Sequence, residues 1–139
     1  MVRILDKAAV QSLSRFNPAK SFTIRRSPSK SGIATIPIRI PAKSQPNRVD
    51  LVATIGVRGI KGIGQIPFRV FRGDTEIFNT QQGIESKGSE QNYVVTFQAE
   101  DRNVKAGTHA YIVTAENVAA NTRVDVAISF SGLAVKTRN

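Results

Sequence analysis

From residue 33 onward, hydrophobic and polar residues alternate with a period of two in one run after another. In one clear run, Leu51, Ile55 and Val57 take the apolar positions while Asp50 and Thr54 lie between them. This alternation places one row of side chains in a core and the other in water, as in an antiparallel sheet. Runs of this kind predict strands at residues 33–40, 49–58, 65–72, 75–80, 91–99, 109–116 and 123–135.

Turn-forming residues separate these runs. The runs at 65–72 and 75–80 are joined by Gly73-Asp74, which predicts a tight hairpin. Stretches rich in Gly, Pro, Asn, Gln, Ser and charged residues predict loops at 41–47, 59–64, 81–88, 101–107 and 117–121.

Two residues indicate special positions within strands. Pro37 has no N–H group for a ladder hydrogen bond, so we expect its strand at a sheet edge. After Gly132 the apolar positions shift by one residue, to Leu133 and Val135, which predicts a β-bulge or bend. The inward positions predict a core that contains Leu51, Ile55, Phe68, Val95, Phe97, Ile112, Val126 and Ile128.

The first 31 residues follow a different pattern. Their apolar residues lie near helical spacing, which predicts an amphipathic helix over 2–16 that ends at Asn17-Pro18. Ser21–Arg26 alternates like a strand, and Ser27–Gly32 has the composition of a linker. We therefore expect a basic N-terminal arm at 1–31 and a body at 32–139.

Seven or eight antiparallel strands in 139 residues predict an all-β fold with one domain. The expected architecture is a two-sheet antiparallel sandwich, jelly-roll-like, with an extended N-terminal arm. Eight strands, with one supplied by the arm, would suit a jelly roll.

Positive charge is concentrated at the start of the chain. Residues 1–48 hold ten Lys or Arg and one acid, whereas 49–139 hold ten Lys or Arg and nine acids. In the arm, the basic residues are interleaved with Phe22 and Ile24, and the chain has no Trp for base stacking. This pattern disfavours nucleic acid and favours addition of a strand to a sheet. The assembly arm would use Phe22 and Ile24 inward with Arg25 and Arg26, and anion contacts would come from Arg15, Lys20 and Lys30.

The arm could dock on a neighbouring subunit, or in cis on its own body. The segment 27–32 could let it reach a neighbour, and an unpaired sheet edge is prone to association. We expect docking in trans, which predicts a homo-oligomer or filament. The alternative is that the basic residues of the arm only form a solvent-exposed strand face and have no function in assembly or binding.

No catalytic or metal-binding constellation stands out. The chain has no cysteine, and His109 has no second histidine to share a metal, so we interpret it as structural. Gly59–Gly64 resembles a phosphate-binding loop, but a strand pattern follows it. Arg72-Gly73-Asp74 could be an adhesive tripeptide, although a turn explains it, and Glu100-Asp101 lacks calcium-site spacing. We expect no enzyme activity and no cofactor.

Apolar runs are short throughout the chain. The longest unbroken one is Ala110–Val113. A membrane span or a signal peptide needs a much longer apolar run, so we expect neither.

Several stretches resemble the exosporium protein C group of Bacillus-type spores. They are Asn47–Gly56, Phe68–Phe78, Gly88–Gln91, Thr114–Asn117 and Ile128–Ala134. The resemblance implies a jelly-roll-like sandwich, comparable to tumour-necrosis-factor and C1q heads, with a structural role in the outer spore layer. It implies no catalytic residue.

These observations predict a structural protein of a spore or cell-surface layer that assembles through its arm. Its partners would be copies of itself and other surface-layer proteins. The alternatives are a small viral capsid protein whose basic arm contacts nucleic acid, and a carbohydrate- or receptor-binding module.

Overall fold

The computed structural model describes residues 3–11, 22–23, 31–59, 62–86, 91–116 and 124–137. Within these ranges the chain forms strands and turns and no helix. The strands are β1 (Arg3–Gln11), β2 (Phe22–Thr23), β3 (Ser31–Ile40), β4 (Asn47–Gly59), β5 (Gly62–Arg72), β6 (Thr75–Ser86), β7 (Gln91–Arg102), β8 (Gly107–Ala115) and β9 (Val124–Lys136). All seven strands predicted for the body are therefore present.

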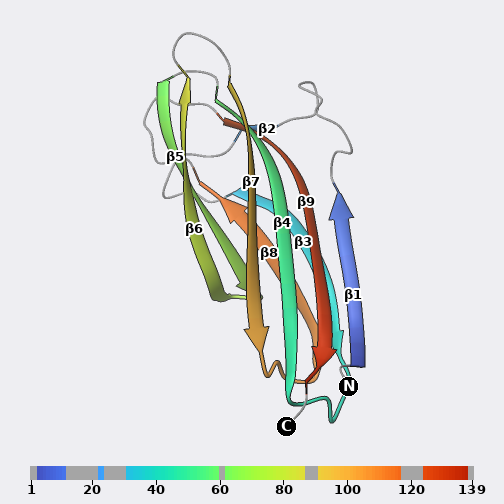
Figure 1. Cartoon of the computed structure of the whole chain (residues 1–139). Coiled ribbons are helices and arrows are strands. Elements are labelled where there is room, and N and C mark those ends of the chain that lie inside the picture. The colour runs from blue at the N-terminus through green and yellow to red at the C-terminus, as the bar shows by residue number, and fades with distance from the viewer. Residues whose placement is uncertain are drawn as a thin grey trace.

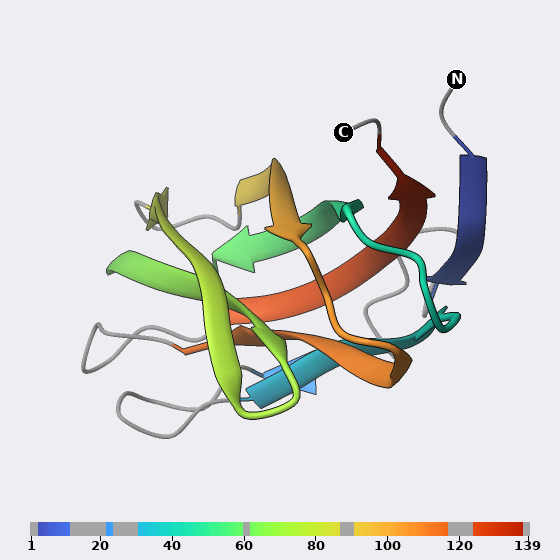
Figure 2. The ribbon, with the colours of Figure 1, turned by 90° about the horizontal axis from the view of Figure 1, so that it is seen from below.

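Two antiparallel sheets face each other in this sandwich (Figures 1 and 2). The larger sheet has the order β1-β9-β4-β7, with β2 also on β9, and the smaller sheet has the order β3-β8-β5-β6. The start of β1 and the end of β9 lie together at one end, with the β3–β4 and β7–β8 loops (Figure 1).

The pairing of strands is that of a jelly roll. Nested antiparallel pairs join β1 and β2 to β9, β3 to β8, β4 to β7, and β5 to β6. The pairs β4–β9 and β5–β8 then link these ribbons side by side. This arrangement confirms the predicted jelly-roll-like sandwich. It also places β3, the strand of Pro37, at a sheet edge as expected.

The core lies between the sheets, where the inward rows of both meet. Phe97 of β7 stacks near Phe68 and Phe78, with ring centroids 5.9 and 5.5 Å away. Six predicted core residues are buried: Leu51, Ile55, Phe68, Val95, Phe97 and Ile128. The Val126 side chain lies outside the described part of the chain.

The prediction for Ile112 is wrong. Its neighbours Tyr111 and Val113 point inward and are fully buried, so Ile112 lies on the opposite face and is half-buried. The cause is the uninterrupted apolar run at residues 110–113, within which alternation does not indicate which face is inward.

The predicted loop at 81–88 is also wrong over the residues described. β6 continues to Ser86, and its Gln81–Ser86 part pairs with β5 down to Gly62. Backbone pairing needs no particular side chain, so a Gln- and Gly-rich segment forms a strand once a partner lies beside it. Similarly, β4 extends to Gly59 and β5 begins at Gly62, inside the predicted 59–64 loop.

The predicted bulge at Gly132 is absent. The β4–β9 register runs without a shift through Leu51 and Gly132, so Gly132 occupies an inward position. A Cβ atom there would lie 2.9 Å from Ile36 Cδ1 and 3.0 Å from Leu51 Cδ2. Gly132 interrupts the row of apolar side chains in β9 because the Ile36 and Leu51 side chains, one from each sheet, occupy the space that its own side chain would need.

The predicted N-terminal helix is a β-strand over the residues described. Arg3–Gln11 pairs with β9, and a bulge at Leu5 shifts the register between Ile4 and Asp6. The bulge lets Leu5 pack against the core together with Ala8 and Val10. Because a bulge breaks the period of two, the apolar spacing resembles that of a helix. Residue 2 and residues 12–16 of the predicted helix lie outside the described part.

Candidate functional site

Most of the predicted arm residues lie outside the described part of the chain. Ile24, Arg25 and Arg26 are among them, as are the expected anion contacts Arg15, Lys20 and Lys30. Phe22 lies in β2, where its backbone pairs with Val126, which agrees with the strand predicted at 21–26. The direction of its side chain remains a prediction.

The N-terminal residues form an interrupted edge strand of the larger sheet. Gln11 pairs with Ser129 and Phe22 pairs with Val126. The two pairing positions are therefore eleven residues apart in the N-terminal segment but only three residues apart in β9. Both pieces run in the same direction along β9, with residues 12–21 between them. In this single chain the arrangement is the cis one of the two docking modes considered above.

Asp6 links this edge strand to the opposite sheet. Its Oδ2 atom accepts a hydrogen bond of 2.7 Å from the backbone N–H of Arg39 in β3. Its Oδ1 atom accepts one of 2.9 Å from the N–H of Lys7. The bulge at Leu5 precedes Asp6, and bulges commonly redirect a side chain. The one acid among the first 48 residues therefore connects the two sheets along their shared edge.

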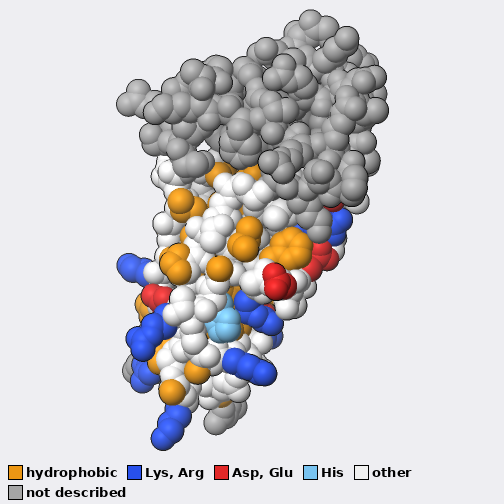
Figure 3. All heavy atoms as spheres, turned by 180° about the vertical axis from the view of Figure 1, so that it is seen from behind, with side chains coloured by type: hydrophobic (Ala, Val, Ile, Leu, Met, Phe, Trp, Pro, Cys, Tyr) orange, Lys and Arg blue, Asp and Glu red, His pale blue; other side chains and the backbone are white. Residues whose placement is uncertain are grey.

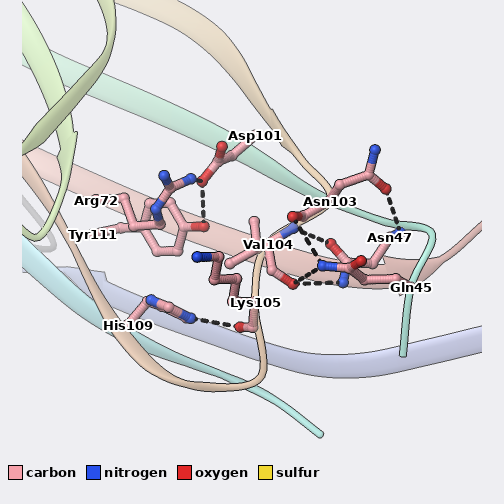
Figure 4. Close-up of polar contacts among 9 residues, drawn as sticks. All are labelled: Gln45, Asn47, Arg72, Asp101, Asn103, Val104, Lys105, His109 and Tyr111. Atoms are coloured by element: carbon pink, nitrogen blue, oxygen red, sulfur yellow. Dashed lines mark hydrogen bonds and ion pairs between the residues drawn. The ribbon is translucent and has the colours of Figure 1, made fainter. Parts of the chain in front are cut away.

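A polar trio, made of buried Asp101 and Tyr111 with half-buried Arg72, lies near the end of the sandwich where the β7–β8 loop turns (Figure 4). The hydroxyl of fully buried Tyr111 donates to Asp101 Oδ2 at 2.7 Å, and Arg72 Nη1 donates to the same oxygen at 2.5 Å. Burial, and then the hydrogen bond to Asp101, raise the pKa of Tyr111 well above its usual range. The contact with Asp101 likewise raises the pKa of Arg72, which stays charged. The trio ties β5, β7 and β8 together.

The two loops at this end are clamped by side-chain amides (Figure 4). Buried Asn47 donates through Nδ2 to the Val104 carbonyl at 2.9 Å and accepts the Val104 N–H at 2.8 Å. Gln45 donates to the Asn103 carbonyl at 3.2 Å. The turns use left-handed backbone at Lys43 (φ 58°) and Asn103 (φ 54°). These bonds hold the β3–β4 and β7–β8 loops in one arrangement.

A groove over the β7–β8 loop has four cations in its lining, which are Lys43, Arg72, Arg102 and Lys105. One hollow of about 230 Å³ is lined by Arg72, Arg102, Asn103, Val104, Lys105 and His109. A second hollow, of about 390 Å³, shares Val104 and Lys105 and adds the polar Lys43, Ser44 and Gln45 and the apolar Ile40, Pro41 and Ala106. Figure 3 shows blue Lys and Arg side chains around the single pale blue histidine on this face. We call the two hollows together the basic groove.

His109 has a structural contact in this groove. Its Nε2 atom lies 2.7 Å from the carbonyl oxygen of Lys105, and since a carbonyl only accepts, Nε2 carries the proton. The ring therefore supports the β7–β8 loop.

The other candidate motifs are engaged in structural roles. Gly73 has φ 57°, which suits the β5–β6 turn, and its N–H donates to the carbonyl of Ala110 in β8 at 2.8 Å. The Arg72 side chain before it contacts Asp101. Gly62, within the glycine-rich stretch, begins strand β5. In the described residues no helix is long and apolar enough to cross a membrane.

The carboxylates of the described residues mostly face cations. Glu100 contacts Arg102 at 3.0 Å, and Asp101 contacts Arg72. Arg69 bridges Glu76 at 2.8 Å and buried Glu116 at 3.2 Å, and these contacts raise its pKa. In the part of the chain that the structure describes, no group of three or more His, Cys, Asp or Glu residues could hold a metal ion.

No protein-family model and no curated protein sequence matches the chain. Among solved structures, those of infectious bursal disease virus strains Gt and Gx match with a TM-score of 0.38 each. They are 6% and 8% identical, over 94% and 97% of this chain. This chain spans 41% of the length of each of those chains. A likeness of that degree carries no functional inference.

Sequence reasoning did not find the basic groove. Lys43, Arg72 and Lys105 are far apart in the sequence. The concentration of positive charge in residues 1–48 favours an anion site in the arm instead. The only local signal was the loop composition at 41–47 and 101–107. Those loops meet only because β4 and β7 are neighbours in the jelly roll.

Proposed function

We propose that the chain is a non-catalytic structural protein that assembles with copies of itself in a spore-surface (exosporium) or other extracellular layer. The jelly-roll fold is compatible with this role, and the resemblance of residues 47–134 to exosporium proteins supports it. Other surface-layer proteins would be further partners. Assembly would proceed through exchange of the N-terminal strand between neighbouring copies.

The position of the N-terminal strand carries this proposal. β1 and β2 form an edge of the larger sheet, and only residues 24–30 lie between β2 and β3. The inward side chains Leu5, Ala8 and Val10 are partly buried, so the strand covers apolar surface that must stay covered. Exchange replaces each contact in cis by the same contact with another copy, which makes it a low-cost route to oligomers.

The outer face of the larger sheet also suits contact between copies. Two neighbouring rows across β1, β9, β4 and β7 carry no charged residue: Ala9, Ser131, Val52 and Gln98, then Gln11, Ser129, Thr54 and Thr96. The next positions of β4 and β7 are Gly56 and Val94, and Val94 is 75% exposed. In a chain of net charge +10, such a face lets two copies approach with little repulsion.

Cysteine pairing tests the exchange, since the natural chain has no cysteine. Ala9 of β1 and Ser131 of β9 are register partners. A tagged Ala9→Cys variant and an untagged Ser131→Cys variant would be refolded together and oxidised. Exchange predicts a mixed disulfide dimer on a non-reducing gel, because the two cysteines are then adjacent only in trans.

A matched control replaces Ser131→Cys by Thr35→Cys, an exposed position in β3 of the other sheet. The control mixture should give only random dimers. If the Ala9 and Ser131 mixture gives no excess of mixed dimer, and the double variant closes its disulfide within one chain, the arm docks in cis and the exchange mechanism is wrong.

The alternatives predict different particles. A capsid protein would purify with nucleic acid, seen as a raised ratio of absorbance at 260 to 280 nm, and a carbohydrate-binding module would be retained on a polysaccharide column. Nucleic-acid-free oligomers in sedimentation would support the structural proposal.

A further inference from the structure

The basic groove combines positive charge with a hollow shape. Lys43, Arg72, Arg102 and Lys105 line it, and no carboxylate among the described residues does. Asp101 offsets Arg72 and Glu100 offsets Arg102, whereas no described carboxylate lies within 4 Å of Lys43 or Lys105. The groove therefore keeps an excess of about two positive charges, which attracts an anion and repels a cation.

Arg72 is held in place from beneath the groove. Asp101 fixes one side of the guanidinium through Nη1, and Asp101 is in turn fixed by the buried Tyr111 hydroxyl. This contact engages one of the five N–H donors that a guanidinium carries. A positioned planar donor loses little side-chain entropy when it binds an oxyanion.

Lys43 and Lys105 lie in two loops that hydrogen bonds hold in place. His109 contacts the carbonyl of Lys105, and Asn47 bonds both the N–H and the carbonyl of the preceding Val104. Lys43 lies in the β3–β4 loop. In that loop the Asn47 Nδ2 atom, which donates to the Val104 carbonyl, also donates to the Ser44 carbonyl at 3.1 Å. Lys105 lies between the two hollows, and each hollow has at least one further cation.

We propose that the basic groove is a binding site for phosphate-type oxyanions. Arg72 and Lys105 would contact one anionic group in the first hollow, and Lys43 would contact a second group in the adjoining hollow. Two hollows that share one lysine suit a ligand with at least two linked phosphates. This site differs from the anion contacts expected in the arm, and it does not depend on the proposed assembly.

Titration with pyrophosphate tests the site on the full-length protein. Amide chemical shifts in ¹⁵N-labelled protein should move first at residues 103–109 and 43–45. Lys105→Gln should weaken binding about tenfold, as expected for the loss of one charge-assisted contact. Lys7→Gln is the matched control: it removes the same charge at an exposed position of β1 outside the groove, and should change the affinity less than about twofold.

The phosphate could belong to a free compound or to a phosphodiester chain. Comparison of pyrophosphate with a decamer of thymidine nucleotides distinguishes them, since the tighter ligand identifies the source. Equal weakening by Lys105→Gln and Lys7→Gln would show general charge attraction and overturn the proposal, as would the absence of saturable binding to either probe. Sedimentation of Lys105→Gln should match that of the natural chain, which separates this test from the test of assembly.

Discussion

At the scale of single residues, Gly132 shows how a missing side chain can be required by the core. Ile36 and Leu51 already occupy the space in front of it. Gly132→Ala should lower the free energy of unfolding by about 1–3 kcal/mol, because a Cβ overpacks a filled core. Thermal or urea unfolding measures the effect.

Gly83→Ala is the control for this substitution. Gly83 is an exposed strand residue of β6, and a Cβ atom added there would meet nothing within 4 Å. The change should therefore stay within about 0.5 kcal/mol. An unchanged melting temperature for Gly132→Ala would show that the inner row of β9 is not packed as described.

Tyr111 should make stability depend on alkaline pH. Its pKa in the folded protein is well above the value of about 10 in an unfolded chain, so its contribution is fully present below about pH 10. As the pH rises above that value, the unfolded state loses a proton that the folded state keeps. Stability should then fall by up to about 1.4 kcal/mol per pH unit.

Urea unfolding between about pH 9 and about pH 11 measures this slope. Tyr111→Phe should reduce the slope, although it lowers stability at neutral pH because Asp101 loses a donor. Equal slopes in the natural chain and in Tyr111→Phe would contradict the buried Tyr111–Asp101 bond.

At the scale of elements, strand β1 is held on two sides. The β9 ladder holds one side and the Asp6 carboxylate holds the β3 side through the Arg39 N–H. Asp6→Ala should speed hydrogen exchange at the Arg39 amide and along residues 3–11 by about tenfold, as one lost charge-assisted hydrogen bond implies.

Hydrogen exchange followed by mass spectrometry measures this effect, and Asp74→Ala is its control. Asp74 lies exposed in the β5–β6 turn, away from β1, and its loss should leave exchange in β1 unchanged. If Asp6→Ala also leaves β1 unchanged, the β9 ladder alone holds the strand.

At the scale of the whole molecule, the uncharged outer face gives assembly a testable surface. Under the proposed function, Thr54→Lys places a charge at the centre of this face, beside Thr96 and Ser129, and should shift the protein toward smaller species in sedimentation. Thr35→Lys adds the same charge to an exposed position of β3 and should not. Identical sedimentation of both variants would exclude this face as an interface.

The sequence alone determined the seven body strands and most of the core, because side-chain alternation is local. Leu51, Ile55 and Phe97 alternate with polar neighbours, so burial of one face follows directly. The same reasoning predicted an edge position for Pro37, since a missing N–H is a property of the residue itself.

Tertiary structure decided whatever depends on partners distant in the sequence. β1 is a strand because its backbone pairs with β9. The bulge at Leu5 breaks the period of two, so the pattern of β1 alone does not indicate a strand. The inward face of the apolar run that contains Ile112 was set by pairing with β3 and β5, not by its own pattern. The basic groove exists because the jelly roll brings Lys43, Arg72 and Lys105 to one end, and no local pattern encodes such proximity.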